Sequence, residues 1–402
     1  MPADLRLASV PRVALVHDFL VGVRGAERVF LEICDLYPDA DVFSPIYDEQ
    51  GTEGRLAGRN VQTSFLQRVR PGKRTFRGLL PLYPAAIRSF DLSGYDLVIS
   101  SSSAWAHAVP TGMATHVCYC HNPFRYAWNE LDRTLAERRD PVSRALLGSF
   151  LRRWREWDRR AAGGVDRYLT NSHTTQARIA ETFGRVSTVV YPPVDTRHFE
   201  PGDVGDSYVL LSALMSHKRI EIAVEAFNRL RLPLVVIGDG PDACRLRALA
   251  GPTVRFTGRL GDGEAARQLA TARAVVVTSV EEFGIAAVEA QAAGRPVLAV
   301  GAGGALETVV DGVTGRLWGG GVEGLVDAVT TFDPLAVDPR ACVENARRFD
   351  RAVFREAFPR QVEIASSARR AAAVNGANGS NGLSLNGHSA AGYPSARGTR
   401  TS

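Results

Sequence analysis

The stretch at residues 274–291, AVVVTSVEEFGIAAVEAQ, contains the features that decide the fold of this chain. Its first residues are apolar on both faces of an extended chain, as in a buried strand of a parallel sheet. Two glutamates follow, then Phe283 and Gly284, and then an alanine-rich segment that favours helix. The stretch therefore predicts one strand–loop–helix unit of an α/β protein.

Two carboxylates frame the start of this predicted helix. Glu281 is expected in the loop and Glu289 on the helix, eight positions later. A carboxylate can hold two neighbouring sugar hydroxyls, and the backbone amides of Phe283, Gly284 and Ile285 would form a helix N-terminus that suits anionic oxygens. Alternatively, the glutamates are only a dipole partner of the helix and a solvated helix position. Because both flank one Phe-Gly helix start, the sequence favours a functional site.

The same alternation of strand and helix extends in both directions along the chain. Most expected strands are apolar on both faces and end in Gly, Ser, Asp or Asn, which indicates parallel strands with helical crossovers. In the first half they lie at residues 13–16, 41–47, 95–101, 115–120, 167–170 and 188–191. In the second half they lie at 208–212, 234–237, 254–257, 274–278 and 296–300. Doubly wound sheets of this kind bind ligands at the ends of their strands.

Prolines and glycines around residue 201 interrupt the series of strands. We therefore predict two α/β domains, at residues 1–200 and 201–345, with a ligand cleft between them. Residues 346–374 are expected to form a C-terminal helix. The segment 375–402, rich in Asn, Gly and Ser and free of acidic residues, is expected to be a disordered tail.

Length and composition agree with this organisation and exclude several classes of protein. The chain has 402 residues, of which 45% are hydrophobic and 23% charged, so it is neither fibrous nor wholly disordered. A net charge of +5 suits anionic ligands or an anionic membrane surface but is too small to indicate DNA binding. The five cysteines lack a zinc spacing and favour buried thiols in a reducing cytoplasm. Neither a signal peptide nor a membrane span is expected, so we predict a cytoplasmic location.

Glu281 and Glu289, in EEFGIAAVE, resemble the E-x7-E signature of glycosyltransferase family 4. The resemblance extends over nearly the whole folded chain, through VHDFLVGVRGAERV (16–29), YCHNPFRYAWN (119–129), TNSHTTQARI (170–179), VVYPPVD (189–195), SALMSHKRIEIAVEAF (212–227), VIGDGPD (236–242), FTGRL (256–260) and GAGGALETVVDGVTGRL (301–317). It implies the GT-B fold, in which two Rossmann-like doubly wound domains, one for the acceptor and one for a nucleotide sugar, face a cleft. In that fold the C-terminal helix would cross back onto the first domain.

The resemblance also implies roles for individual residues. Glu289 would bind the ribose hydroxyls of a nucleotide sugar, and Glu281 would bind hydroxyls of the donor sugar. Lys218 would neutralise the leaving diphosphate, together with the amides at the start of the helix; the alternative is one basic residue on a solvated helix start. The catalytic set implied in this way is His121, Glu281 and Lys218.

Further positions follow from the same resemblance. Gly25 would let the backbone approach the phosphates or the sugar, or would be a plain turn glycine. His121, directly after a strand, would lie beside the reacting sugar carbon. Asp18 also follows a strand, but helix capping explains it equally well. Relatives usually carry an arginine at the position of Ala213, and Arg219 is a candidate to compensate for it.

The activity that the resemblance implies is that of a retaining, metal-independent hexosyltransferase. Mannose from GDP-mannose is the first choice of donor, and the acceptor would be lipid-linked or a polysaccharide in cell-envelope glycan synthesis. No Asp-x-Asp motif of the type that holds a divalent ion on a diphosphate is identified, so neither a metal nor a cofactor is expected. A nucleotide-sugar epimerase of the same fold and a non-catalytic basic binding module remain alternatives. Nucleic acid is not an expected partner, because the paired glutamates would repel its phosphates.

Basic residues accumulate between residues 54 and 90, where no acidic residue occurs before Phe90. They are Arg55, Arg59, Arg68, Arg70, Lys73, Arg74, Arg77 and Arg88. Apolar residues interleave with them, namely Phe65, Phe76, Leu79, Leu80, Leu82 and Tyr83. This composition suits peripheral docking on the inner face of the plasma membrane; a solvated, partly buried loop is the alternative. Trp154 and Trp157 are spaced for one helix face and are expected to point toward the core.

Overall fold

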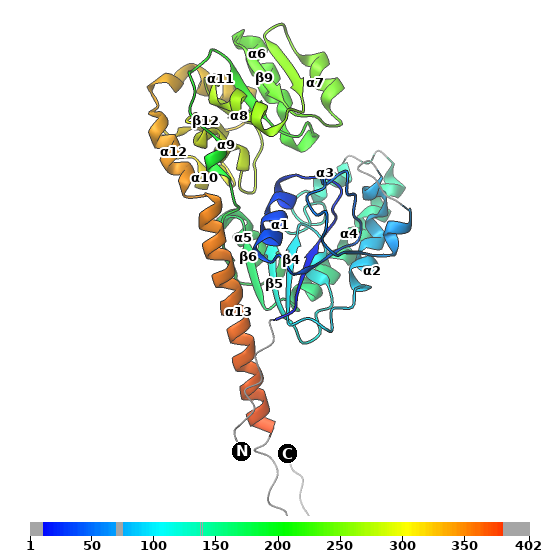
Figure 1. Ribbon diagram of the computed structural model, residues 1–402. Helices are drawn as coiled ribbons and strands as arrows, with labels where there is room; N and C mark the ends of the chain where they lie inside the picture. Colours follow the sequence, from blue (N-terminus) through cyan, green and yellow to red (C-terminus); the bar gives the residue numbers. More distant parts are fainter. Residues whose placement is uncertain (1–10, 70–74, 137, 139, 381–402) are drawn as a thin grey trace, which may run out of the picture.

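The computed structural model describes residues 11–69, 75–136, 138 and 140–380 (Figure 1). Two α/β domains lie one above the other, and a long helix, α13 (Arg351–Ser380), runs from the upper domain along the lower one. Each domain contains one sheet whose strands are all parallel. This arrangement confirms the predicted fold of two doubly wound domains.

The N-terminal domain contains a seven-stranded sheet in the order β3-β2-β1-β4-β5-β6-β7. Its strands are β1 (Val13–His17), β2 (Asp41–Ser44), β3 (Val61–Thr63), β4 (Leu97–Ser102), β5 (Thr115–Cys120), β6 (Arg167–Thr170) and β7 (Ser187–Val189). Its α-helices are α1 (Gly25–Leu36), α2 (Tyr83–Arg88), α3 (Leu131–Ala136), α4 (Pro141–Ala162) and α5 (His173–Phe183). Its 3-10 helices are η1 (Phe65–Val69), η2 (Phe76–Leu82), η3 (Ala106–Ala108) and η4 (Thr196–His198).

The C-terminal domain contains a six-stranded sheet in the order β10-β9-β8-β11-β12-β13. Its strands are β8 (Tyr208–Leu211), β9 (Leu234–Ile237), β10 (Val254–Gly258), β11 (Val275–Val277), β12 (Val297–Val300) and β13 (Gly315–Trp318). Its α-helices are α6 (Ile220–Leu230), α7 (Ala243–Leu249), α8 (Asp262–Ala270), α9 (Ile285–Ala292), α10 (Ala305–Thr308), α11 (Gly321–Thr331) and α12 (Pro339–Arg347). Its 3-10 helices are η5 (Ser216–Lys218) and η6 (Pro334–Ala336).

The strand order reverses once in each sheet, between β1 and β4 and between β8 and β11. At such a point the loops that leave two neighbouring strands turn to opposite faces of the sheet, which opens a crevice at their carboxyl ends. The stretch at residues 274–291, which contains β11 and α9, therefore starts at the reversal point of the second sheet.

All eleven predicted strands overlap a strand of the structure, and β5, β6 and β9 have the predicted bounds. The prediction missed β3 and β13, which are both edge strands. Edge strands have only one neighbour in the sheet, so they need neither the length nor the continuous apolar character of a central strand.

The chain passes between the domains twice, and the two passages hydrogen-bond to each other. The amide of Val194 donates to the carbonyl of Phe349 at 3.0 Å, and the amide of Arg351 donates to the carbonyl of Val194 at 2.9 Å. The domains are thus joined by a two-stranded connection that begins before Pro201 and includes the start of α13.

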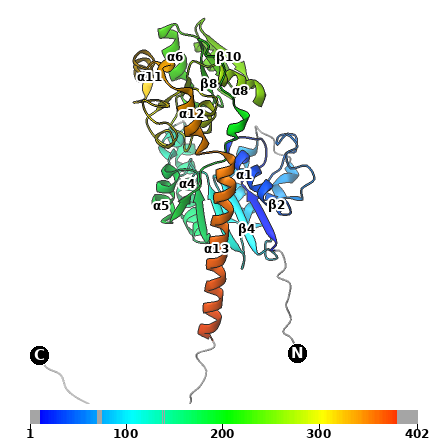
Figure 2. The same ribbon diagram turned by 60° about the vertical axis from the view of Figure 1, so that its left-hand side comes forward.

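Helix α13 packs on the N-terminal domain, as Figure 2 shows from a second direction. Phe354 and Phe358 are buried, with ring centroids 6.0 and 6.2 Å from that of Tyr119 on β5. Arg351 and Arg355 form ion pairs with the buried carboxylate of Glu32 on α1. The helix starts later than the sequence indicated and continues to Ser380, into the segment expected to be disordered, so that boundary was wrong; residues 381–402 lie outside the described part of the chain.

The structure also places the tryptophans and cysteines that sequence analysis considered. Trp154 is buried in the core of the N-terminal domain, and Trp157 packs against the same core, as predicted. Four of the five free cysteines are buried, but Cys244 is exposed, so the expectation of buried thiols was wrong for that residue.

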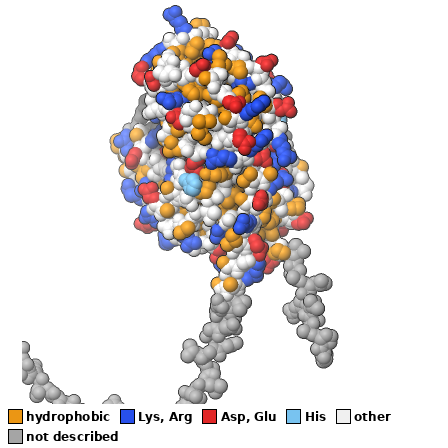
Figure 3. All heavy atoms as spheres, turned by 90° about the vertical axis from the view of Figure 1, so that its left-hand side faces the viewer, with side chains coloured by type: hydrophobic (Ala, Val, Ile, Leu, Met, Phe, Trp, Pro, Cys, Tyr) orange, Lys and Arg blue, Asp and Glu red, His pale blue; other side chains and the backbone are white. Residues whose placement is uncertain are grey.

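Acidic and basic side chains are interspersed over the face shown in Figure 3. Among the described helices, none combines the length and the apolar character needed to cross a membrane.

Candidate functional site

Residues that sequence analysis assigned to the site come from carboxyl ends of strands in both domains. His121 directly follows β5, Lys218 ends η5 after β8, and Glu281 lies in the loop between β11 and α9. Glu289 lies on α9 itself. Lys218 and Glu281 therefore lie at the reversal point of the second sheet, whereas His121 follows β5, one strand beyond the reversal point of the first sheet.

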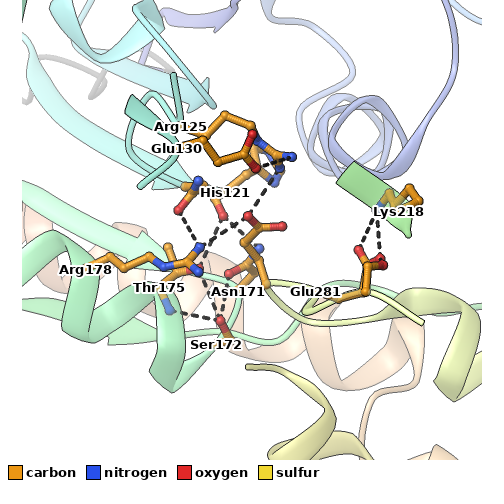
Figure 4. A network of polar contacts seen from close by, with 12 residues as sticks. His121, Arg125, Glu130, Asn171, Ser172, Thr175, Arg178, Lys218 and Glu281 are labelled. Atoms are coloured by element: carbon orange, nitrogen blue, oxygen red, sulfur yellow. Dashed lines mark hydrogen bonds and ion pairs between the residues drawn. The ribbon is translucent and has the colours of Figure 1, made fainter. Parts of the chain in front are cut away.

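Lys218 and Glu281 form an ion pair with each other. The ammonium nitrogen Nζ of Lys218 lies 2.6 and 2.8 Å from the two carboxylate oxygens of Glu281 (Figure 4). Thr278 fixes the loop by donating to the carbonyl of Lys218 at 2.7 Å. Burial opposes ionisation of Glu281, but the charge and hydrogen bond of Lys218 outweigh it and lower the pKa of this carboxyl. Two groups expected to bind different parts of a ligand thus neutralise each other here.

Glu289 is paired with an arginine from the other domain. Arg28 on α1 donates to Oε1 of Glu289 at 2.8 Å and lies 3.6 Å from Asp262. The Glu289 side chain is only 10% exposed, and burial raises the pKa of its carboxyl even though Arg28 acts to lower it. Sequence analysis missed Arg28; its only signal was a position three residues after Gly25 in a quoted motif.

The start of α9 has the geometry of an anion site. Gly284 is the N-cap, with a left-handed backbone (φ 94°) that favours glycine. Phe283 is buried, and its backbone lies so close to Gly304 that a Cβ there would be 2.3 Å from Phe283 Cα. In the part of the chain that the structure describes, no atom accepts a hydrogen bond from the amides of Phe283, Gly284 or Ile285. These three N–H groups can therefore bind an anionic oxygen.

Gly25 and Asp18 occupy the reversal point of the first sheet. Gly25 begins α1, and a Cβ there would lie 3.6 Å from Cδ1 of Ile285, an ordinary contact across the two domains. The carboxylate of Asp18 is buried and accepts from the amides of Trp105 and Ala106 at 2.9 and 2.7 Å. Asp18 therefore holds the start of η3. It does not cap the helix that follows it in the chain, because the N-cap of α1 is Arg24.

His121 is buried and held on both its ring and its backbone. Its ring nitrogen Nε2 lies 2.8 Å from Oγ of Ser101. Its carbonyl accepts from Asn171 at 3.0 Å and from Thr175 at 3.3 Å (Figure 4). Burial, and then the proximity of His17, lower the pKa of His121 to about 3. The imidazole is therefore neutral at physiological pH.

Two arginines of the N-terminal domain converge on Glu282, a residue that sequence analysis passed over. Arg125 and Arg178 each lie 3.2 Å from Oε1 of Glu282, and Arg178 also donates to Asn122 at 2.9 Å. Burial lowers the pKa of Arg125, but the charge of Glu282, then that of Glu130 and more weakly that of Glu281, outweigh it and raise this pKa. We call the region defined by Arg28, Arg125, Arg178, Glu282 and Glu289 the domain junction.

Ala213 contributes no charge to this region, and Arg219 does not replace one. Arg219 is the N-cap of α6, with a left-handed backbone (φ 53°), and its guanidinium lies 3.6 Å from Glu221 on that helix. The N-terminal domain supplies Arg125, which lies 3.2 Å from Glu282, the residue after Glu281.

Among the described residues, no three His, Cys, Asp or Glu side chains lie close enough together to hold a metal ion. The independence of metal ions stays a prediction.

Two family models match the chain. The model described as "Glycosyltransferase Family 4" matches residues 23–198, and the one described as "Glycosyl transferases group 1" matches residues 206–332. Together they cover about three quarters of the chain, with one model on each domain.

Similar proteins of known name match a smaller part of the chain. A GDP-mannose-dependent alpha-(1-6)-phosphatidylinositol monomannoside mannosyltransferase of Mycobacterium tuberculosis is 31% identical in an alignment of length 223 that covers 47% of this chain and 55% of the relative. A D-inositol 3-phosphate glycosyltransferase 2 of Catenulispora acidiphila is 33% identical in an alignment of length 233 that covers 46% of this chain and 53% of the relative. The chain thus spans about half the length of the curated relatives that it matches.

Solved structures share the fold over most of the chain. Anabaena HepE in complex with UDP-glucose has a TM-score of 0.66 at 20% identity, over 89% of this chain and 99% of that one. Sucrose-phosphate synthase from Thermosynechococcus elongatus has a TM-score of 0.69 at 17% identity, over 89% and 100% of the two chains. At these identities the likeness concerns the arrangement of the two domains.

Proposed function

Because this chain belongs to glycosyltransferase family 4, we propose that it is a retaining, metal-independent hexosyltransferase. It would transfer mannose from GDP-mannose, as the first choice of donor, to a lipid-linked or polysaccharide acceptor in cell-envelope glycan synthesis. One observation carries the proposal: Lys218, Glu281 and Glu289 lie around the reversal point of the second sheet, where open α/β sheets bind nucleotides.

Donor binding would exchange the pairs seen in the structure for contacts with the nucleotide sugar. Glu289 would leave Arg28 and accept from the ribose hydroxyls, and Glu281 would accept from hydroxyls of the sugar. Lys218, released from Glu281, would bind the diphosphate. When the bond between sugar and diphosphate breaks, negative charge grows on the diphosphate, and Lys218 with the free amides at the start of α9 stabilises it. Holding donor and acceptor together supplies the rest of the rate enhancement.

The comparisons support parts of this donor assignment. The name of the mycobacterial relative specifies GDP-mannose, while the complex of the Anabaena protein contains UDP-glucose. Both are nucleoside diphosphate sugars, which is the class that Lys218 and Glu289 would recognise. We prefer GDP-mannose because the mycobacterial protein is the more similar in sequence.

A lipid-linked acceptor requires access to a membrane, and η1 and η2 offer exposed apolar side chains for it. Phe65 and Val69 are exposed on η1, which also contains Arg68, and Leu82 is exposed at the end of η2. Arg59, by contrast, donates to the carbonyl oxygens of Tyr37 and Pro38 at 3.1 Å and so caps the end of α1. Arg70, Lys73 and Arg74 lie outside the described residues. We propose peripheral docking through this tract at the cytoplasmic face of the membrane.

Calorimetric titration with GDP, UDP, ADP, GDP-mannose and UDP-glucose tests the function. Glu289→Ala removes a partner of the ribose and should weaken GDP binding about 5- to 150-fold, which corresponds to about 1–3 kcal/mol. Glu281→Ala should instead lower turnover and leave GDP affinity nearly unchanged. Glu323→Ala, on the exposed face of α11, is the matched control and should change neither property.

The possible results discriminate between the alternatives. Binding of no nucleotide would remove the glycosyltransferase proposal, and tight binding of UDP-glucose alone would remove the mannose assignment. Release of free GDP without glycosylation of an acceptor would favour the epimerase. Turnover should survive treatment with EDTA, and a complete loss that manganese restores would contradict the metal-independent mechanism.

A further inference from the structure

A line of buried polar side chains connects His121 to the interior of the N-terminal domain. Oγ of Ser101, near the end of β4, lies 2.8 Å from Nε2 of His121 and 3.1 Å from Nδ1 of His17, at the end of β1. On its other side the His17 ring presents Nε2 to Glu27 on α1, 3.9 Å from Oε1. Ser101 and His17 are almost completely buried. None of these connections was anticipated from the sequence.

The carboxylate of Glu27, 3.9 Å from Nε2 of His17, favours one direction of the hydrogen bonds. It attracts a proton to Nε2 of His17, which makes Nδ1 of His17 an acceptor. In that tautomer Ser101 donates its hydroxyl proton to His17. The oxygen of Ser101 keeps its acceptor capacity, and it can only be used by an N–H at Nε2 of His121. This sequence of bonds leaves Nδ1 of His121 unprotonated.

No residue in the described part of the chain bonds to that Nδ1 atom. His121 also precedes Asn122, which is hydrogen-bonded to Arg178 at the domain junction. An unprotonated ring nitrogen can only accept a hydrogen bond, so it suits a hydroxyl group and not a phosphate oxygen.

We propose that Ser101 and His17 are positioning residues that hold His121 as the Nε2–H tautomer, so that its Nδ1 accepts a hydrogen bond from a sugar hydroxyl of the donor or acceptor. This inference rests on the proposed function. It adds two residues to the site and assigns a chemical class to the partner of His121. The neutral state of the His121 ring, which follows from its lowered pKa, is consistent with this role.

The structure contains a matched control for this arrangement. Ser100, one residue earlier on β4, lies 2.8 Å from Nε2 of His116 with its Oγ. Successive residues of a strand point to opposite faces of the sheet, so this serine–histidine pair lies on the other side of β4. Ser100 and His116 are as deeply buried as Ser101 and His17. Ser100→Ala and Ser101→Ala therefore remove the same chemistry from opposite faces of one strand.

The test measures the tautomer of His121 directly, by ¹⁵N NMR of the histidine rings in the full-length protein. The signal is assigned by its loss in His121→Asn. In the wild type it should report a proton on Nε2 alone. Ser101→Ala should produce a mixture of both tautomers, whereas Ser100→Ala should alter only the signal of His116. Ser101→Thr retains the hydroxyl and should restore the wild-type pattern.

Turnover provides the second measurement. With the nucleotide sugar that binds best, Ser101→Ala should lower kcat about tenfold or more, Ser101→Thr should recover most of it, and Ser100→Ala should leave it unchanged. If Ser101→Ala does not fold, His17→Asn, which keeps an acceptor near the position of Nδ1, should preserve the tautomer, and His17→Leu should not.

Three results would overturn the proposal. They are a wild-type His121 protonated on Nδ1, a tautomer that is unchanged in Ser101→Ala and His17→Leu, and equal losses of kcat in Ser100→Ala and Ser101→Ala. The tautomer is measured without any donor. A failure of the inference is therefore distinguishable from a failure of the proposed function, which would show as the absence of nucleotide binding.

Discussion

Arg28 and Glu289 are separated by 261 positions in the chain, yet they form an ion pair of 2.8 Å between the two domains. The carboxylate expected to bind a ribose is therefore paired with a cation of the opposite domain. A ligand that uses Glu289 must compete with Arg28, and the protonation state of Glu289 decides the outcome.

We expect GDP binding to weaken as the pH falls, since burial raises the pKa of Glu289 and only the ionised carboxylate accepts strongly from ribose hydroxyls. Arg28 lowers that pKa, so Arg28→Ala should move the loss of affinity to higher pH. Calorimetric titrations at a series of pH values would measure both midpoints. Glu289→Gln, which cannot ionise, should show no such transition, and identical profiles for the wild type and Arg28→Ala would contradict the coupling.

Arg125 should matter more for turnover than Arg219. Arg125 lies 3.2 Å from Glu282 of the opposite domain, beside Glu281 in the same loop, whereas Arg219 lies 3.6 Å from Glu221 on its own helix. Removing a cation that stabilises the departing diphosphate typically costs about 10²-fold in kcat. We expect Arg125→Ala to show a loss of that order and Arg219→Ala to remain close to the wild type. A larger effect of Arg219→Ala would assign the compensating charge to α6.

Helix α13 should contribute strongly to the stability of the N-terminal domain. Phe354 is buried against Tyr119, so Phe354→Ala should lower the free energy of unfolding by about 3–5 kcal/mol. Val353, its neighbour on the exposed side of the helix, is the matched control, and Val353→Ala should cost less than about 1 kcal/mol. Urea denaturation of both variants measures the difference. Equal effects would mean that α13 is not part of the core.

The membrane proposal predicts co-sedimentation with anionic vesicles and not with neutral ones. Binding should weaken with added salt, because the Debye length falls from about 10 Å at 0.1 M to about 3 Å at 1 M. Replacing Arg70, Lys73, Arg74 and Arg77 by Gln should abolish it. A control with the same loss of charge, in which Arg229, Arg245, Arg247 and Arg267 of the C-terminal domain become Gln, should still bind. Unchanged binding of the first variant would favour the solvated-loop alternative.

The sequence predicted the central strands well because burial on both faces leaves a continuous apolar run, as in β5 and β9. It also located Glu281, Glu289 and Lys218 through a motif. The sequence did not predict that Lys218 pairs with Glu281 or that Arg28 pairs with Glu289. Ser101 lies on a strand in which three consecutive serines look alike, and only the register of β1 against β4 shows which of them meets His17.

The return of α13 also has a consequence for the order in which the newly made chain can fold. The strands of the C-terminal sheet all lie between residues 208 and 318, so that domain can close its core before translation ends. The core around Leu15 and Phe30 includes Phe354, Phe358 and Val362, which leave the ribosome much later. The half of the protein that is synthesised first is therefore completed last. Resistance to proteases in ribosome-bound chains of increasing length should accordingly appear in the C-terminal domain before the N-terminal one.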